Sequence, residues 1–211
     1  MKTEQLVDLL ATQAGPAPRH TVQMRLGTAV LLGIVASLAC AVLLLGLNPG
    51  LFDLGAALAV KALYVCGVLV AAVALADRLA RPGAAMRREG LALTAVVVLM
   101  GFTALSAVLR VPAANRLDML LGRSWAQCPW RVAALSVPAL MAALWAMRGL
   151  APTRPRLAGA AAGLMAGGAG AIGYSLYCPE VSPLFVLVWY SIGMLIPAGL
   201  GAVIGPRVLR W

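Results

Sequence analysis

Residues 26–47 read LGTAVLLGIVASLACAVLLLGL, a stretch without a single charged side chain. A helix that crosses the hydrocarbon core of a bilayer needs about 20 predominantly apolar residues, and this stretch supplies them. It is too long for the apolar region of a cleavable signal peptide, and a polar lead, residues 1–25, precedes it. The stretch therefore predicts a permanent transmembrane helix.

Further apolar stretches follow along the chain and predict six spans in all. The expected spans are 26–47, 55–76, 91–109, 132–147, 157–177 and 184–204. Of the 211 residues, 62% are hydrophobic and 11% are charged, whereas a soluble domain carries about 25% charged residues. We therefore expect an all-α, polytopic membrane protein, a six-helix transmembrane bundle. The segments between spans are too short for a soluble catalytic domain, so we expect no enzyme.

The charge of the chain gives an orientation. There are 17 Lys and Arg residues against 7 Asp and Glu, a net charge of +10, and basic residues collect in cytoplasmic segments. With the N-terminus inside, the inner segments hold Lys2, Arg19, Arg25, Arg78, Arg81, Arg87, Arg88, Arg148, Arg154, Arg156, Arg207 and Arg210. The outer segments hold Arg110, Arg116, Arg123 and Arg131. This asymmetry predicts that residues 1–25 and the tail, 205–211, are cytoplasmic, and it explains the charge without direct nucleic-acid binding.

The N-terminal segment contains a short amphipathic pattern that Gly15 and Pro16 end. Its apolar face consists of Leu6, Val7, Leu9 and Leu10. A helix of about three turns is marginal alone in water, so it needs a surface to bind. That surface is either the membrane interface or a groove on a protein partner. Glu4 and Asp8 argue mildly against an anionic lipid surface.

The four cysteines fall into two classes. Cys40 and Cys66 lie inside expected spans and are interpreted as small packing residues. Cys128 and Cys178 lie at the ends of expected spans, both on the outer side, and we expect two water-accessible thiols at similar depth. A structural interpretation is that they form a static disulfide or are two unrelated thiols. A functional interpretation is that they form a thiol switch or a soft-metal site.

The surroundings of Cys128 and Cys178 provide candidate neighbours. The predicted neighbours are Arg123, Trp125, Arg131 and Glu180. Arg123 and Arg131 flank Cys128 and would stabilise its thiolate, the reactive form. Asp118 and Glu180 could add oxygen ligands. No cofactor or firm metal site is predicted, the alternative being a transient soft heavy-metal ion at Cys128 and Cys178. The single histidine, His20, lies on the cytoplasmic side.

Two further features of the spans leave alternatives open. Lys61 lies within the second span and either snorkels to the outer interface or forms a buried pair, for example with Glu180. The fifth span places Gly159, Gly163 and Gly167 at four-residue spacing, which favours close helix packing. That packing is expected inside the bundle, with a homo-oligomer or a moving helix as the alternatives.

The long outer loop is expected to contain a short helix. Asn115 can cap it and Gly122 can end it. Trp125 and Trp130 would anchor the same surface at the membrane interface.

Three stretches carry a resemblance to a known family. They are GRSWAQC at 122–128, APTRP at 151–155, and CPE at 178–180 followed by SPLFVLVWY at 182–190. With six spans and a short N-terminal helix, the chain resembles the NrsF family, the negative regulators of sigma-F. These are anti-sigma factors of the bacterial inner membrane, and the resemblance covers almost the whole chain.

The resemblance implies a partner and a signal. The N-terminal segment would hold an extracytoplasmic-function sigma factor at the membrane. Cys128 and Cys178 would sense heavy-metal or oxidative stress on the periplasmic side, and this would release the sigma factor. We associate the family with a histidine immediately before the second cysteine, and here that position is Tyr177. This departure weakens a histidine-assisted metal site and favours a pure thiol switch.

Two other functions fit the sequence less well. A small transporter or permease needs a polar path, and the spans offer only Lys61 and scattered Ser and Thr residues. A membrane thiol oxidoreductase needs two outer cysteine pairs, and the expected topology gives one. The expected partners are therefore a sigma factor and the lipid bilayer.

Overall fold

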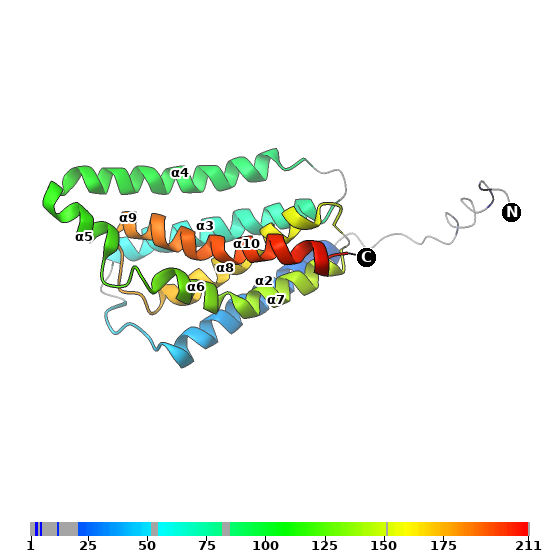
Figure 1. Cartoon of the computed structure of the whole chain (residues 1–211), viewed down its shortest axis with the longest axis horizontal. Helices are drawn as coiled ribbons and strands as arrows, with labels where there is room; N and C mark the ends of the chain where they lie inside the picture. The colour runs from blue at the N-terminus through cyan, green and yellow to red at the C-terminus, as the bar shows by residue number, and fades with distance from the viewer. Residues whose placement is uncertain are drawn as a thin grey trace.

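The computed structural model describes residues 21–51, 55–81, 85–150 and 152–210, together with Thr3, Gln5 and Thr12. Regular structure in this part of the chain is helical, with no strand. The long helices lie side by side in one bundle (Figure 1). They are α2 (Thr21–Leu44), α3 (Gly55–Leu79), α4 (Arg87–Arg110), α8 (Pro155–Ser175) and α10 (Ser191–Val208).

Shorter helical elements complete the bundle. They are the 3₁₀ turn η2 (Ala113–Asn115), α5 (Arg116–Leu121), α6 (Cys128–Leu135), α7 (Val137–Arg148), α9 (Pro183–Phe185) and the π-helical turn η3 (Val186–Tyr190). The short helix α5 confirms the helix predicted between Asn115 and Gly122 in the outer loop.

The described helices confirm the predicted class. Five of them are long and apolar enough to cross a membrane, counting the continuous run Pro183–Val208 as one. The bent pair α6–α7 makes a sixth if it is a single broken span. The third helix extends past its predicted range, 91–109, to Arg87 and Arg110, because charged residues continue the helix at each end.

The fourth predicted span, 132–147, differs from the structure in form. Its helix begins earlier, at Cys128, and α6 and α7 meet at a 45° bend. Pro138 lies in the first turn of α7 and has no N–H to continue the hydrogen-bond ladder. Ser37 of α2 donates to the Leu135 carbonyl beside the break at 2.8 Å. The break is therefore stabilised by a polar contact from a neighbouring helix.

Helix α8 lies at the centre of the bundle. It packs against α2, α3, α6, α7 and α10. In its most apolar window 78% of the residues are buried, against 11% for α4. Small side chains let α8 accept neighbours on every face, because its backbone can approach theirs closely.

The glycine face of α8 packs on α10. A Cβ on Gly159 would overlap the carbonyl of Gly201, and a Cβ on Gly163 would overlap that of Pro197. Gly167 lies against Met194 in the same way. The small-residue spacing of the fifth span therefore serves packing inside the bundle, as predicted. We call this contact the α8–α10 seam.

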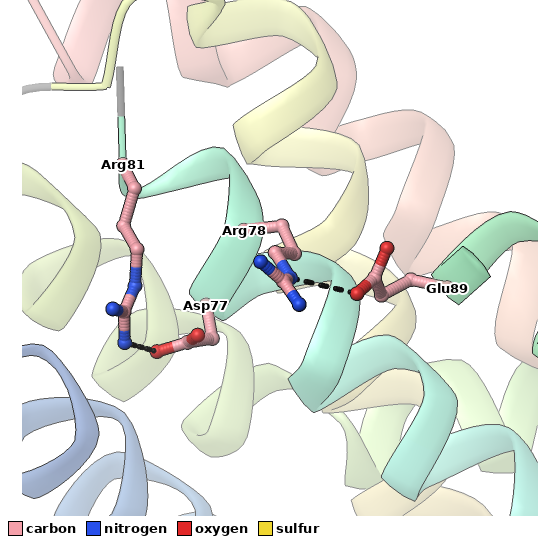
Figure 2. Close-up of polar contacts among 4 residues, drawn as sticks. All are labelled: Asp77, Arg78, Arg81 and Glu89. Atoms are coloured by element: carbon pink, nitrogen blue, oxygen red, sulfur yellow. Dashed lines mark hydrogen bonds and ion pairs between the residues drawn. The ribbon is translucent and has the colours of Figure 1, made fainter. Parts of the chain in front are cut away.

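Helix α4 lies at the periphery and is joined to the bundle mainly through α3. Figure 2 shows the junction of these helices: Arg78 of α3 pairs with Glu89 of α4, with 2.7 Å between Nε and Oε1. Arg81 pairs with Asp77 on its own side of the connection at 3.0 Å. The Arg78–Glu89 ion pair thus ties the end of α3 to the start of α4.

The two ends of the bundle differ in what they carry. The start of α2 and the end of α10 lie at the same end (Figure 1). The opposite end carries α5, the first turn of α6 and the turn between α8 and α9, and we call it the cysteine end. Which end faces the cytoplasm stays a prediction from the charge pattern.

The α8–α10 seam should tolerate no added side chain. We expect Gly163→Ala to lower the stability of the bundle by about 1–3 kcal/mol, because the new Cβ forces the two backbones apart. The matched control is Gly199→Ala on α10, where a Cβ meets nothing within 4 Å. Thermal unfolding of the detergent-solubilised protein measures both, and equal midpoints would contradict the seam.

Candidate functional site

The first cysteine of the predicted pair opens a helix at the cysteine end. Cys128 is the first residue of α6, and Pro129 follows it. Proline is common in a first turn because the missing N–H has no partner there in any case. The Cys128 N–H donates to the Ser124 carbonyl at 2.9 Å, which joins the preceding loop to the helix start.

The second cysteine lies just past a helix end, also at the cysteine end of the bundle. The Cys178 N–H donates to the Tyr174 carbonyl at 3.0 Å, just past the end of α8. Both cysteines belong to one buried cluster with Tyr174 and Tyr190. The Ser124 hydroxyl lies 3.9 Å from the Cys178 sulfur. The structure therefore brings together the two segments that carry the cysteines, and both thiols are free.

The prediction of water-accessible thiols is wrong for this conformation. Cys128 and Cys178 each have 0% exposed surface. Phe185, Val186 and Tyr190, all equally buried, belong to the same cluster and come from the start of the last span. A sequence places the two cysteines at span ends but does not show that a neighbouring helix covers them. A thiol without contact to water is unreactive until the cover opens.

Lys61 of α3 is part of this site. It is 1% exposed, so the predicted snorkelling to the interface is wrong. Its ammonium donates to the carbonyls of Cys178 at 2.9 Å and Glu180 at 3.1 Å. It also lies 5.1 Å from the centroid of the Tyr190 ring, a cation–π distance. The alternative, a buried pair with the Glu180 carboxylate, is not among the ion pairs of the described residues, and the contact with Glu180 is to its backbone carbonyl.

The Glu180 carboxylate holds the outer loop instead. Its Oε1 accepts the backbone N–H of Arg123 at 2.8 Å. It occupies the space that a Cβ on Gly122 would need, at 2.8 Å from that position to the carboxyl carbon. Gly122 also has φ +52°, a conformation that favours glycine. Gly122 therefore both ends α5 and admits the carboxylate.

Two more hydrogen bonds fasten α5 to the start of the last span. Ser182 donates to the Met119 carbonyl at 3.0 Å, and the Trp189 indole donates to the Leu120 carbonyl at 2.8 Å. The Trp125 ring packs on Trp189 with 5.3 Å between centroids. We call residues 111–127 the outer loop; it is docked on the segment that follows Cys178.

The predicted neighbours of the cysteines lie on both sides of Cys178. Arg123, Trp125 and Glu180 make the contacts above, and the Arg131 guanidinium lies 5.1 Å from the centroid of the Tyr177 ring. Lys61, which is not among these predicted neighbours, contacts the carbonyl of Cys178 itself. The signal that could have identified it is its position as a charge inside a span.

The predicted oxygen ligands do not join the cysteines. Asp118 and Glu180 line a hollow of about 550 Å³ together with Gly122, Arg123 and Pro179, and neither cysteine lines it. Within the described residues, no three His, Cys, Asp or Glu side chains gather in a way that could hold a metal ion. A soft-metal site at Cys128 and Cys178 therefore depends on the sulfurs themselves.

The predicted partner-binding face lies outside the described residues. This face consists of Leu6, Val7, Leu9 and Leu10.

Comparison with known proteins adds the evidence of relatives. Residues 10–211 match the NrsF family, described as negative regulator of sigma F. The chain is 38% identical over 216 residues to the probable anti-sigma-F factor NrsF of Azospira oryzae. It is 40% identical over 222 residues to the anti-sigma-F factor NrsF of Caulobacter vibrioides. Both alignments cover 100% of each chain. No solved structure matches.

Docking of the outer loop should depend on the Trp189 indole. Trp189→Phe keeps an aromatic ring but removes the N–H that donates to the Leu120 carbonyl, a loss of about 0.5–1.5 kcal/mol. We expect trypsin to cleave the variant after Arg116 and Arg123 severalfold faster than it cleaves the parent protein. Mass spectrometry on the solubilised protein measures the cleavage rates. Trp130→Phe is the matched control, because Trp130 is 69% exposed. Equal cleavage rates in the two variants would contradict the proposed docking.

Proposed function

The chain belongs to the NrsF family of negative regulators of sigma F, and we propose that it is a membrane-bound anti-sigma factor. The observation that carries this proposal is the full-length similarity to two proteins named as anti-sigma-F factors. Those relatives are named as regulators and not as enzymes. The long apolar helices support the membrane location.

The proposed partner is an extracytoplasmic-function sigma factor, held by residues 1–25. The apolar face of Leu6, Val7, Leu9 and Leu10 suits a groove on a protein, with acidic residues on the other side of the helix. The proposed location is the bacterial inner membrane with both termini cytoplasmic. The basic residues at the end of the bundle where α2 begins support this orientation.

The proposed signal is heavy-metal or oxidative stress at Cys128 and Cys178. The two thiols come from separate segments and are buried in one cluster. A close-packed interior leaves no room for an added group, so a metal ion or oxidised sulfur at this place must alter the packing. Chemical change at the thiols is thereby converted into a change of shape.

Helix α8 is the proposed route from the thiols to the other end of the bundle. It ends next to Cys178 and, at about 1.5 Å per residue, extends about 30 Å to its start at Pro155. A signal shifts the affinity for the sigma factor only if the bundle has two packings with different affinities. The α8–α10 seam, in which backbones rather than long side chains touch, is the contact that would differ between them.

Removing either thiol of the pair should abolish the response. We expect Cys128→Ser and Cys178→Ser to keep sigma-dependent transcription at its uninduced level under cadmium or peroxide challenge, because the sensing groups are gone. Cys40→Ser and Cys66→Ser are matched controls and should respond normally. A reporter assay in cells measures all four, and an intact response in both pair variants would refute the sensing role.

Capture of the partner should depend on the apolar face of the N-terminal segment. We expect Leu6→Asp with Leu9→Asp to weaken binding of the sigma factor by more than about tenfold, since each buried leucine contributes roughly 1.5–3 kcal/mol. Asp8→Asn, on the polar side, should bind normally. Affinity capture with the full-length protein measures this; undiminished capture by the double variant would refute docking through this face.

A further inference from the structure

Lys61 is a charge in a place where charges are costly. It lies in the second turn of α3, inside a span, and is 1% exposed. Ionisable side chains inside a membrane span are expensive and usually have a function. The ion pairs found among the described residues are Arg78–Glu89 and Arg81–Asp77, and neither includes Lys61. Its charge is therefore not balanced by a carboxylate ion pair in this part of the chain.

What the ammonium does contact is one short turn. It donates to the first and last carbonyls of the Cys178–Glu180 turn, and it lies over the Tyr190 ring. Hydrogen bonds to a charged donor are stronger than neutral ones. The ammonium therefore clamps the turn to α3 and to the beginning of the last span at the same time.

This turn is also the support of the outer loop. Glu180 at its far end accepts the Arg123 N–H, and Ser182 next to it donates to Met119. Cys178 at its near end is fully buried. If the turn leaves α3, Cys178 moves out of the cluster that buries its sulfur, and the anchor of the outer loop is lost with it.

We propose that Lys61 is the positioning residue of the cysteine site: its ammonium clamp on the Cys178–Glu180 turn keeps the Cys178 thiol covered. The consequence for signalling rests on the function proposed above, but the clamp itself does not. A methionine would fill the same space at lower cost in this interior. The charge therefore serves to hold the Cys178–Glu180 turn.

The test is the accessibility of Cys178 in the purified full-length protein in lipid nanodiscs. The background variant carries both Cys40→Ser and Cys66→Ser, so that Cys128 and Cys178 are the remaining thiols. A membrane-impermeant maleimide labels an exposed thiol, and mass spectrometry measures the rate of labelling at each cysteine. Lys61→Met removes the donors while keeping an unbranched side chain, and Lys61→Arg keeps both charge and donors. Tyr64→Phe is the matched control: Tyr64 is one turn away on α3, buried, and hydrogen-bonded at 2.6 Å to Ser191 instead of the turn.

We expect Lys61→Met to label at Cys178 at least about tenfold faster than the parent, because the charged hydrogen bonds are lost. Lys61→Arg and Tyr64→Phe should stay near the parent rate. Parent-like labelling of folded Lys61→Met overturns the proposal, as does equal acceleration in Tyr64→Phe, which would show general loosening. If Lys61→Met does not elute as a folded particle, Lys61→Gln takes its place with the same criteria.

A transcription reporter separates the clamp from the proposed function. If both the clamp by Lys61 and the proposed anti-sigma function are correct, Lys61→Met raises sigma-dependent transcription without an inducer. Faster labelling with unchanged transcription leaves the clamp supported and counts against the proposed coupling to a sigma factor.

Discussion

The close approach of the α8 and α10 backbones is the contact on which the rest of the molecule depends. Lipid tails are as apolar as leucine, so helices in a bilayer gain little from burying large apolar side chains against each other. Packing at short range must supply the attraction instead, and glycine permits it. Gly159 and Gly163 meet Gly201 and Pro197 without an intervening side chain. This contact keeps α8 in the centre and fixes the place of the turn that carries Cys178.

Much of this architecture could be predicted from local sequence, because lipid imposes simple rules on length and composition. The spans and the packing role of Gly159 and Gly163 are examples. The bend between α6 and α7 is only partly predictable from the sequence. Pro138 is a local signal for it, but Ser37, which donates to the Leu135 carbonyl beside the bend, is 98 residues away along the chain. Lys61 illustrates the limit of prediction from sequence, since its partners are backbone carbonyls, one of them 117 residues away. Every residue has a backbone carbonyl, so the residue type does not identify the partner.

The candidate site shows the same division. Its residues Cys128, Cys178 and Glu180 were recognisable by type and by position at span ends. Their burial and pairing depend on how the outer loop folds over the last span, through Gly122 and Trp189. The result is a site in which the start of the last span buries the two thiols and the outer loop is docked on the segment that follows Cys178. Under the sensing function proposed above, such a site is silent when closed, and the strength of its hydrogen bonds sets the threshold at which it opens.

The peripheral position of α4 has a consequence for the depth of the site. Its apolar stretch, residues 91–109, is about 28 Å long at 1.5 Å per residue, close to the roughly 30 Å of a bilayer core. Arg87 and Arg88 mark one limit and Arg110 the other. The 3₁₀ turn η2 and helix α5 follow within a few residues of Arg110, which places the outer loop at headgroup level if α4 spans the bilayer. Under the sensing function proposed above, the lipids around this loop set the local concentration of a charged reagent, so membrane composition would help to determine how readily the cysteine site responds.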